Sequence, residues 1–427
     1  MNVLLLNPPA SRPYLRDYFC CSESKSGYLW HPIDLLIQSG ILSKSYRIFF
    51  IDGIAEKLSD KDVLNIMEEI KPDVIFSLVG SLSYEEDTKF LRACKNRWNS
   101  LIVCSGDILL EDEPPEWVDA VLTNFLSDEL LLFIEGKREG FNFLKVKNDK
   151  ERGNKRTFKE KFRYPVPLHK IFMKNGYRLP FIPYPFASIL TSFGCPFRCS
   201  YCNSGNIGFS LRDIENIKEE VEAILSIGIR HIFIKDMTFL SDTEHSLKVM
   251  ELMKKYGITY NCYTRAELVN ENLLYELKRS GCIMLQIGVE STNEDALRKL
   301  GRNADIKWTK EVFKMAKKLG IRTGAHFIFG LPYHSQEDVD KTISFACELK
   351  PDYASFNVFI PRPASNLWRE NFETLQDEKR KWLKKAYLSF LFRGWRIEKV
   401  PKNFRLMGEF LREGFKLYKN LLRRENG

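Results

Sequence analysis

Short apolar runs alternate with amphipathic stretches along the first 137 residues. Apolar runs bounded by turn residues are typical of buried strands, and apolar positions three or four apart are typical of helices. The pattern predicts strands at Val3–Asn7, Arg47–Asp52, Asp73–Val79, Ser100–Ser105 and Val118–Thr123. It predicts helices near Pro32–Ser43, Lys61–Ile70, Tyr84–Trp98 and Asp128–Gly136. This alternation builds an α/β domain with a doubly wound parallel sheet, whose ligands bind beyond the carboxyl ends of the strands.

A second alternating stretch runs from Pro185 to Pro363. It predicts strands at Ala187–Ser192, His231–Lys235, Ile258–Tyr263, Met284–Val289, Arg322–Phe329 and Tyr353–Phe359. Amphipathic helices are predicted between them, near residues 214–225, 244–256, 271–280, 307–319 and 336–349. Six such strands, alternating with helices, make an incomplete barrel.

Polar residues recur where these barrel strands end. Asp236, Arg265 and Glu290 follow the second, third and fourth strands, and the cysteine-rich loop follows the first. Barrel enzymes assemble their sites from the carboxyl ends of strands, so we expect these side chains to share one edge.

The chain divides into four predicted segments. Residues 1–140 form the sheet domain, 141–184 a linker, 185–365 the partial barrel and 366–427 a helical tail. In the tail, apolar residues repeat at helical spacing and are expected to pack on the barrel: Phe404, Met407, Phe410, Leu411 and Phe415.

The net charge of +9 is concentrated in this tail. Residues 366–427 hold 16 Lys and Arg against 8 Asp and Glu, a balance of +8, which leaves +1 for the rest. A solvated helical face is the simpler explanation. The alternative is contact with an anionic substrate or an anionic membrane surface, for which the last basic residues are candidates: Lys416, Lys419, Arg423 and Arg424.

Composition is that of a globular protein, with 44% hydrophobic residues in 427 and no apolar stretch of membrane-spanning length. The first residues, Met1–Asn7, lack the basic start of a signal peptide and are better explained as a strand. We therefore expect a cytoplasmic protein, peripheral to a membrane if the tail binds one. Most of the scattered cysteines are expected to be small buried hydrophobes.

Three cysteines stand apart because Cys195, Cys199 and Cys202 form a C-x3-C-x2-C array. Three thiolates this close can hold three corners of a 4Fe-4S cube and leave the fourth iron open for a small molecule. A structural zinc site is the alternative, but it usually takes four ligands in two pairs. The next cysteine is Cys262 and the next histidine is His231, and neither repeats a pair spacing.

With Tyr201 in its aromatic position, this array resembles the defining C-x3-C-x-aromatic-C motif of the radical S-adenosylmethionine (SAM) superfamily. The resemblance covers about Pro185 to Pro363 and implies the superfamily's (β/α)6 partial TIM barrel, whose strand count the six predicted strands match. It implies that the free iron chelates SAM and that reductive cleavage gives methionine and a 5'-deoxyadenosyl radical. It further implies an electron donor such as flavodoxin or ferredoxin.

The resemblance also implies SAM-binding residues. Lys235–Phe239 is similar to a D-x-x-F variant that places Asp236 near the SAM ammonium or ribose. Gly288–Ser291 is similar to a G-x-E-S strand end, which places Glu290 and Ser291 near SAM. Arg265 matches a recurring arginine, and residues 324–332 resemble a segment along the adenine. Tyr201, His326 and Gly330 complete this predicted set.

A sheet domain ahead of such a barrel resembles the cobalamin-associated branch of the superfamily. The implied corrinoid contacts at strand ends are Ser81 and Gly106. Two features depart from the branch. The D-x-H-x-x-G motif is absent, and its Gly-Gly loop reads Cys104–Asp107 here. The domain therefore either binds cobalamin or keeps the fold without a corrinoid.

These observations predict a radical SAM enzyme, with a cobalamin-dependent methyltransferase acting on an unactivated carbon as the first hypothesis. A corrinoid-free radical SAM enzyme catalysing dehydration, rearrangement, coupling or ring formation is the alternative. A third interpretation is an iron-sulfur regulatory or nucleic-acid-binding protein, but the chain lacks an RNA-recognition or helix-turn-helix signature, so we expect no nucleic-acid partner. The sequence does not identify the substrate, for which an anionic or lipid-like molecule is one expectation.

Overall fold

In the computed structural model, residues 1–110, 115–147, 161–370 and 376–394 are described. The chain forms two compact units. Unit 1 comprises Met1–Ala187 and Glu215–Gly228, and unit 2 comprises Ser188–Ile214 and the chain from Ile229 onward. None of the helices in the described ranges combines the length and apolar character that a bilayer crossing needs.

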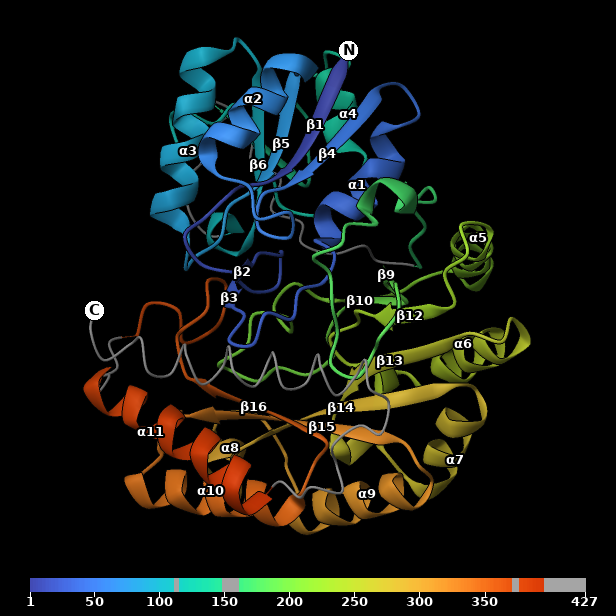
Figure 1. Cartoon of the computed structure of the whole chain (residues 1–427), viewed down its shortest axis with the longest axis vertical. Helices are drawn as coiled ribbons and strands as arrows, with labels where there is room; N and C mark the ends of the chain where they lie inside the picture. Colours follow the sequence, from blue (N-terminus) through green and yellow to red (C-terminus); the bar gives the residue numbers. More distant parts are fainter. Residues whose placement is uncertain (111–114, 148–160, 371–375, 395–427) are drawn as a thin grey trace. The chain divides into compact units, whose positions relative to one another are not determined.

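Unit 1 is built on a six-stranded sheet in the order β4-β1-β5-β6-β7-β8 (Figure 1). Its strands are β1 (Asn2–Asn7), β4 (Arg47–Asp52), β5 (Val74–Leu78), β6 (Leu101–Ser105), β7 (Ala120–Leu122) and β8 (Leu144–Val146). The pairings from β4 to β7 are parallel, and β8 joins β7 antiparallel. This confirms the predicted parallel α/β sheet, and it places β8 inside the segment expected to be a linker.

Helices cover both faces of this sheet (Figure 1). They are α1 (Ile33–Leu42), α2 (Asp60–Ile70), α3 (Tyr84–Arg97) and α4 (Glu129–Ile134). Val63 and Met67 of α2 and Phe90 of α3 pack with Leu4 and Ile75 of the sheet in one buried cluster. Ser59 and Asp62 form a capping box that satisfies the first N–H groups of α2. A short pair of strands, β2 (Tyr14–Leu15) and β3 (Ser22–Glu23), follows β1.

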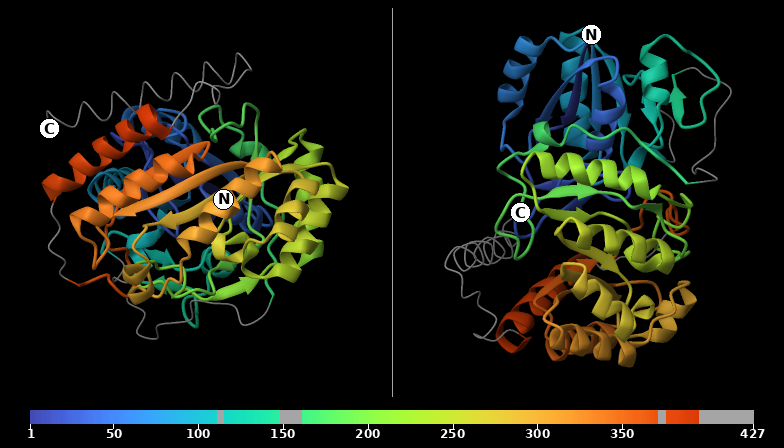
Figure 2. Two further views of the ribbon diagram at one scale, coloured as in Figure 1. Left: turned by 90° about the horizontal axis from the view of Figure 1, so that it is seen from below. Right: turned by 90° about the vertical axis from the view of Figure 1, so that its right-hand side faces the viewer.

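Unit 2 contains the second six-stranded sheet, in the order β16-β15-β14-β13-β12-β9. Its strands are β9 (Ala187–Ile189), β12 (His231–Ile234), β13 (Thr259–Thr264), β14 (Cys282–Glu290), β15 (Arg322–Phe329) and β16 (Tyr353–Val358). The pairings from β12 to β16 are parallel. The helices after these strands are α6 (Thr243–Lys255), α7 (Glu271–Arg279), α8 (Glu294–Lys299), α9 (Ile306–Lys318), α10 (Gln336–Leu349) and α11 (Gln376–Ser389). Figure 2 shows the yellow-to-orange helices along one side of these strands.

Strand register separates an outer face from an inner face. Phe356 on the outer face contacts the rings of Tyr387, which lies in α11, and of Phe390, which comes directly after that helix. Tyr263, Gln286 and Tyr353 lie in register on the other face. Outward residues are therefore apolar and covered by helices, whereas the inner face carries the polar side chains, as a partial barrel with an internal site requires.

One predicted barrel helix belongs elsewhere. Helix α5 (Ile214–Ser226) lies in unit 1, where its Glu220 accepts hydrogen bonds from Tyr164 and His169. The predicted apolar repeat from Phe404 to Phe415 and the four terminal basic residues lie outside the described residues.

Candidate active site

A two-stranded hairpin presents the three motif cysteines. Strands β10 (Ser192–Gly194) and β11 (Phe209–Leu211) pair antiparallel, and the cysteine loop connects them. Gly194 has φ +74°, and a Cβ there would lie 1.7 Å from the carbonyl oxygen of Gly208. Only glycine tolerates both this φ and this close approach, so the residue before Cys195 closes the hairpin. The loop is fixed further because the backbone N–H of Ser200 donates to Leu300 O at 2.9 Å.

The three thiols are partly exposed and free of disulfides. Cys195 Sγ lies 3.7 Å from Thr238 Oγ1, and Cys199 Sγ lies 4.0 Å from Arg265 Nη1. Burial raises the pKa of the Cys199 thiol, whereas the nearby Arg265 and Arg302 charges lower it. Burial also raises the pKa of Cys202. Two cations beside a cysteine favour its thiolate form, which is the form that binds iron.

The donor set fits a 4Fe-4S cluster open at one corner. Three soft thiols lie within eight residues of one loop, which suits iron-sulfur ligation. In the described part of the chain no group of three or more His, Cys, Asp or Glu side chains converges as a ready site for a single metal ion. A cube does not need such convergence, because each thiolate binds a different iron.

Asp236, predicted to contact SAM, lies buried just after β12. Its Oδ1 accepts the backbone N–H of Thr191 at 2.7 Å, and its Oδ2 accepts the hydroxyls of Thr191 at 2.5 Å and Ser192 at 2.8 Å. Burial raises the pKa of this carboxyl group, and these hydrogen bonds oppose that effect. Asp236 therefore anchors the strand that leads into the cysteine hairpin.

Glu290 and Arg265 lie near one another at the ends of β14 and β13. Glu290 has φ +65°, beside a register shift between β14 and β15, which is a strained conformation for a residue with a side chain. Burial raises the pKa of Glu290, and the positive charges of Arg302 and Arg265 lower it. The Arg265 guanidinium also lies over the Phe197 ring, 4.1 Å from its centroid, so it connects the cysteine loop to Glu290.

Arg302 is a site residue that the sequence did not reveal. It follows α8 and is buried, and its Nη2 donates to Gly288 O at 2.5 Å. Its Nε has no hydrogen-bond partner within the described ranges. Arg302 Nη2 lies 3.7 Å from Glu267 Oε1, close enough for an ion pair. A basic residue after a helix is usually a solvated one, so nothing in the local sequence marked this burial.

The other predicted SAM residues are less closely grouped. Tyr201 packs in a cluster with Leu297, Leu331 and the partly buried Cys199 and Cys202. Ser291 Oγ accepts the backbone N–H of Asn293, a contact at the start of α8.

Two further predicted residues lie on β15 or just after it. His326 Nε2 pairs with Gln286 Oε1 at 3.0 Å on the inner face, and burial lowers its pKa to about 4. Gly330 has φ +68°, and a Cβ there would meet Trp382 at 2.9 Å. Their roles toward SAM stay predictions.

Ser81 and Gly106, predicted to contact a corrinoid, do not fit that role in this structure. Both the backbone N–H and the hydroxyl of Ser81 donate to Asp107, at 2.8 and 2.7 Å. A Cβ at Gly106 would lie 1.9 Å from Val79 O, so this glycine serves the packing of its own chain. Neither residue therefore supports a reaction step that passes through a corrinoid.

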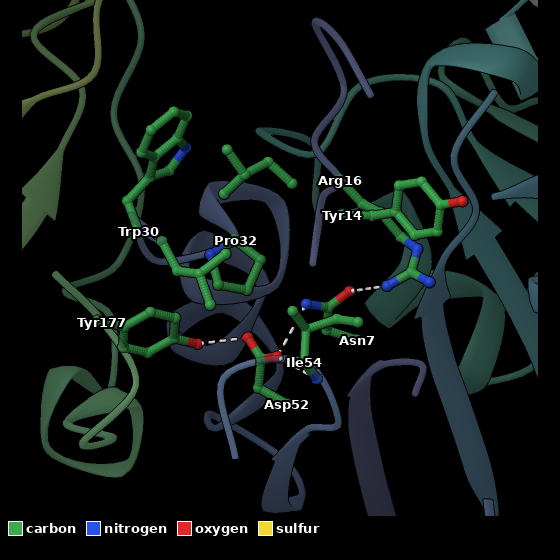
Figure 3. Close-up of a pocket in the computed structure, with 10 residues that line it drawn as sticks. Asn7, Tyr14, Arg16, Trp30, Pro32, Asp52, Ile54 and Tyr177 are labelled. Atoms are coloured by element: carbon green, nitrogen blue, oxygen red, sulfur yellow. Dashed lines mark hydrogen bonds between the residues drawn. The ribbon is translucent and has the colours of Figure 1, made fainter. Parts of the chain in front are cut away.

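Unit 1 does contain a small pocket at the ends of β1 and β4 (Figure 3). Asn7 and Tyr177 both donate to the buried Asp52 carboxylate, at 3.0 and 2.6 Å. Trp30 and Tyr14 also line it.

Comparisons with known proteins find similarity in a family model, in protein sequences and in solved structures. The model of the radical SAM superfamily matches residues 189–346. An uncharacterised methyltransferase from Pyrococcus horikoshii is 26% identical over 86% of this chain and 82% of its own. The anaerobic magnesium-protoporphyrin IX monomethyl ester cyclase of Rubrivivax gelatinosus is 22% identical over 80% of this chain and 66% of its own.

Among solved structures, the radical SAM methyltransferase TsrM from Kitasatospora setae, with cobalamin and a 4Fe-4S cluster bound, matches with a TM-score of 0.65. The match is 15% identical and covers 86% of this chain and 77% of that one, which establishes the common fold. Residues 189–346 therefore form a radical SAM domain, which implies an enzyme with a 4Fe-4S cluster and SAM as cofactors.

Proposed function

We propose that this enzyme functionalises an unactivated carbon of its substrate, with Cys195, Cys199 and Cys202 as the cluster ligands. When bound, the cluster and SAM supply a 5'-deoxyadenosyl radical that abstracts hydrogen. The observation that carries the proposal is the hairpin that holds three free cysteines beside two arginines.

The chain's own residues position this chemistry. Arg265 and Arg302 place positive charge beside Cys199 and Glu290, which favours thiolate ligands and a charged acceptor for the ammonium group of SAM. Asp236 ties Thr191 and Ser192 in place and so fixes the strand entering the hairpin. An external one-electron donor of the flavodoxin or ferredoxin type would reduce the cluster.

Methyl transfer is the first candidate for the product-forming step. It is supported by the names of the Pyrococcus relative and of TsrM. The second candidate is a corrinoid-free rearrangement, dehydration, coupling or ring formation. It is favoured by the engagement of Ser81 with Asp107 and of Gly106 with its own chain.

The proposal is tested by anaerobic reconstitution with iron, sulfide, SAM and a strong reductant, with and without hydroxocobalamin. Mass spectrometry then measures 5'-deoxyadenosine and product. Cys199→Ala is expected to abolish SAM cleavage. Cys347→Ala, which alters a buried cysteine on α10 outside the motif, should retain it. SAM cleavage by the Cys199 variant at the wild-type rate would refute the assignment.

A further inference from the structure

The carboxyl edge of the unit 1 sheet has one position where a ligand is expected. The strand order places β1 between β4 and β5, so chain connections leave β1 and β5 in opposite directions there. Doubly wound sheets bind flavins and similar large cofactors in the crevice at such a switch point. The residues at this crevice are Asn7, which ends β1, and Val79 and Gly80, which follow β5.

The Arg16 side chain occupies this crevice. Arg16 and Asp87 have fully buried side chains and form an ion pair at 2.6 Å. The other Arg16 N–H groups donate to Asn7 Oδ1, Pro8 O and Ser83 Oγ, each at 2.9 Å. The guanidinium thus connects the end of β1 to the start of α3. Displacing it would leave a buried carboxylate without its counter-ion, which is strongly unfavourable.

Asp87 closes the β5 side of the same crevice. Its Oδ2 accepts the backbone N–H of Gly80 at 3.0 Å and the Ser83 hydroxyl at 2.7 Å. Cys21 fills the space above Gly80, because a Cβ built there would lie 2.4 Å from Cys21 Sγ. A glycine that makes room for a ligand would face empty space, whereas Gly80 faces a side chain of its own chain.

Asp107 extends the closure to β6. Its carboxylate accepts the backbone N–H of Cys21 at 2.9 Å in addition to both donors of Ser81. Asp107 is fully buried. The segment that carries Arg16 and Cys21 is thereby fastened across the ends of β1, β5 and β6 by buried, charge-assisted hydrogen bonds, which are the stronger class.

We propose that unit 1 holds no corrinoid, because Arg16 and Cys21 of its own chain fill the switch-point crevice that a corrinoid's nucleotide tail would need. This inference rests on the proposed function only in one respect: the test uses SAM cleavage as its activity control. It favours the second candidate reaction class over methyl transfer from a methylated corrinoid.

The test uses full-length enzyme, reconstituted anaerobically with iron and sulfide and then incubated with excess hydroxocobalamin. After desalting, the corrinoid retained per chain is measured from its absorbance after cyanide extraction. We expect no stoichiometric corrinoid and an unchanged yield of 5'-deoxyadenosine. One corrinoid retained per chain would overturn the inference. Failure to cleave SAM in both samples would instead count against the proposed function, since retention is measured independently of turnover.

A second readout measures the alkylation of the Cys21 thiol. Burial raises the pKa of its thiol to about 12, so it should resist alkylation in the native enzyme. Peptide mapping by mass spectrometry after iodoacetamide treatment should find Cys21 equally protected with and without hydroxocobalamin. Iodoacetamide labelling of Cys21 that changes when hydroxocobalamin is added would show that the segment moves aside for the corrinoid, which also overturns the inference.

Discussion

At the scale of single residues, the same carboxylate chemistry serves two purposes in this enzyme. Asp236 has hydrogen bonds to both oxygens, from a backbone N–H and two hydroxyls. Glu290 instead interacts with two arginines at a distance and sits in a strained backbone conformation. Strain of this kind persists where surrounding structure imposes it, and it is common at ligand sites. Glu290 is therefore the better candidate for direct contact with a cofactor, and Asp236 for support.

The supporting role of Asp236 predicts a difference between two substitutions. Asp236→Asn keeps an acceptor for the Thr191 N–H and should cost about 1 kcal/mol, whereas Asp236→Ala leaves buried donors unsatisfied and should cost about 3 kcal/mol. Denaturant unfolding measures both. If Asp236 acted only by binding SAM, the two variants would lose SAM affinity equally and keep wild-type stability.

His231 predicts a pH dependence of stability. Burial lowers its pKa from 6.5 to about 4, and its ring hydrogen-bonds Asn261 and Thr259. Between these two pKa values the unfolded chain binds a proton that the folded chain does not, so this contribution to stability falls as the pH falls. The shift corresponds to at most about 3 kcal/mol.

His231→Asn removes this proton uptake and is the test. The stability gap between wild type and variant, from urea unfolding, should narrow as the pH falls from neutral to about 4. A gap that stays constant over this range would contradict the prediction.

Only some of the residues of the candidate site could be predicted from the sequence. Cys195, Cys199 and Cys202 are close in sequence, and Arg265 and Glu290 follow strands, so position alone indicated them. Arg302 reaches the site from a loop that is distant from the cysteines in sequence, and its burial depends on tertiary packing. Ser81 and Gly106 occupy the predicted strand ends, but the sequence did not show that Ser81 donates to Asp107 or that Val79 O packs closely against Gly106.

At the scale of elements, the β10–β11 hairpin decides whether the cysteines are presented together. Gly194→Ala would force a Cβ to within 1.7 Å of Gly208 O, so the hairpin must open. We expect the variant to lose most of its iron and sulfide after reconstitution. Gly228→Ala is the matched control, because Gly228 also has positive φ but a Cβ there meets nothing within 4 Å. That control should cost only about 1 kcal/mol of backbone strain and load the cluster normally.

Most of the longer elements followed from the sequence, although the six-residue helix α8 was not predicted. Of the short strands, β7, β9 and β12 fall within predicted strands. The predicted bounds of β4 and β15 agree with the structure, because each is a long apolar run between turn residues. Strands β8, β10 and β11 have three residues each, too few to show a period. Helix α5 was predicted, but amphipathicity does not say which sheet a helix packs against, and its partners lie at Tyr164 and His169.

At the scale of the whole molecule, the buried Arg16–Asp87 ion pair should stabilise unit 1 and leave the stability of unit 2 unchanged. Arg16→Met would leave Asp87 buried and unpaired, at a cost of about 3–5 kcal/mol. Hydrogen exchange measured by mass spectrometry should accelerate in β1, β5 and α3 and stay unchanged in β13–β15. Lys248→Met, which breaks an exposed i,i+4 pair with Glu244, is the control and should cost below about 0.5 kcal/mol. Faster exchange throughout both units would contradict the prediction.

The division of the chain has a consequence for its synthesis. Unit 1 is discontinuous, and its last helix, α5, is encoded after the cysteine loop. On the ribosome, the sheet domain therefore waits for residues 215–228 before it is complete, and by then all three motif cysteines have left the exit tunnel. A single cut in the gene cannot separate the units without removing a helix from one of them. Isolating the sheet domain requires that α5 be rejoined to residue 187 through a designed linker.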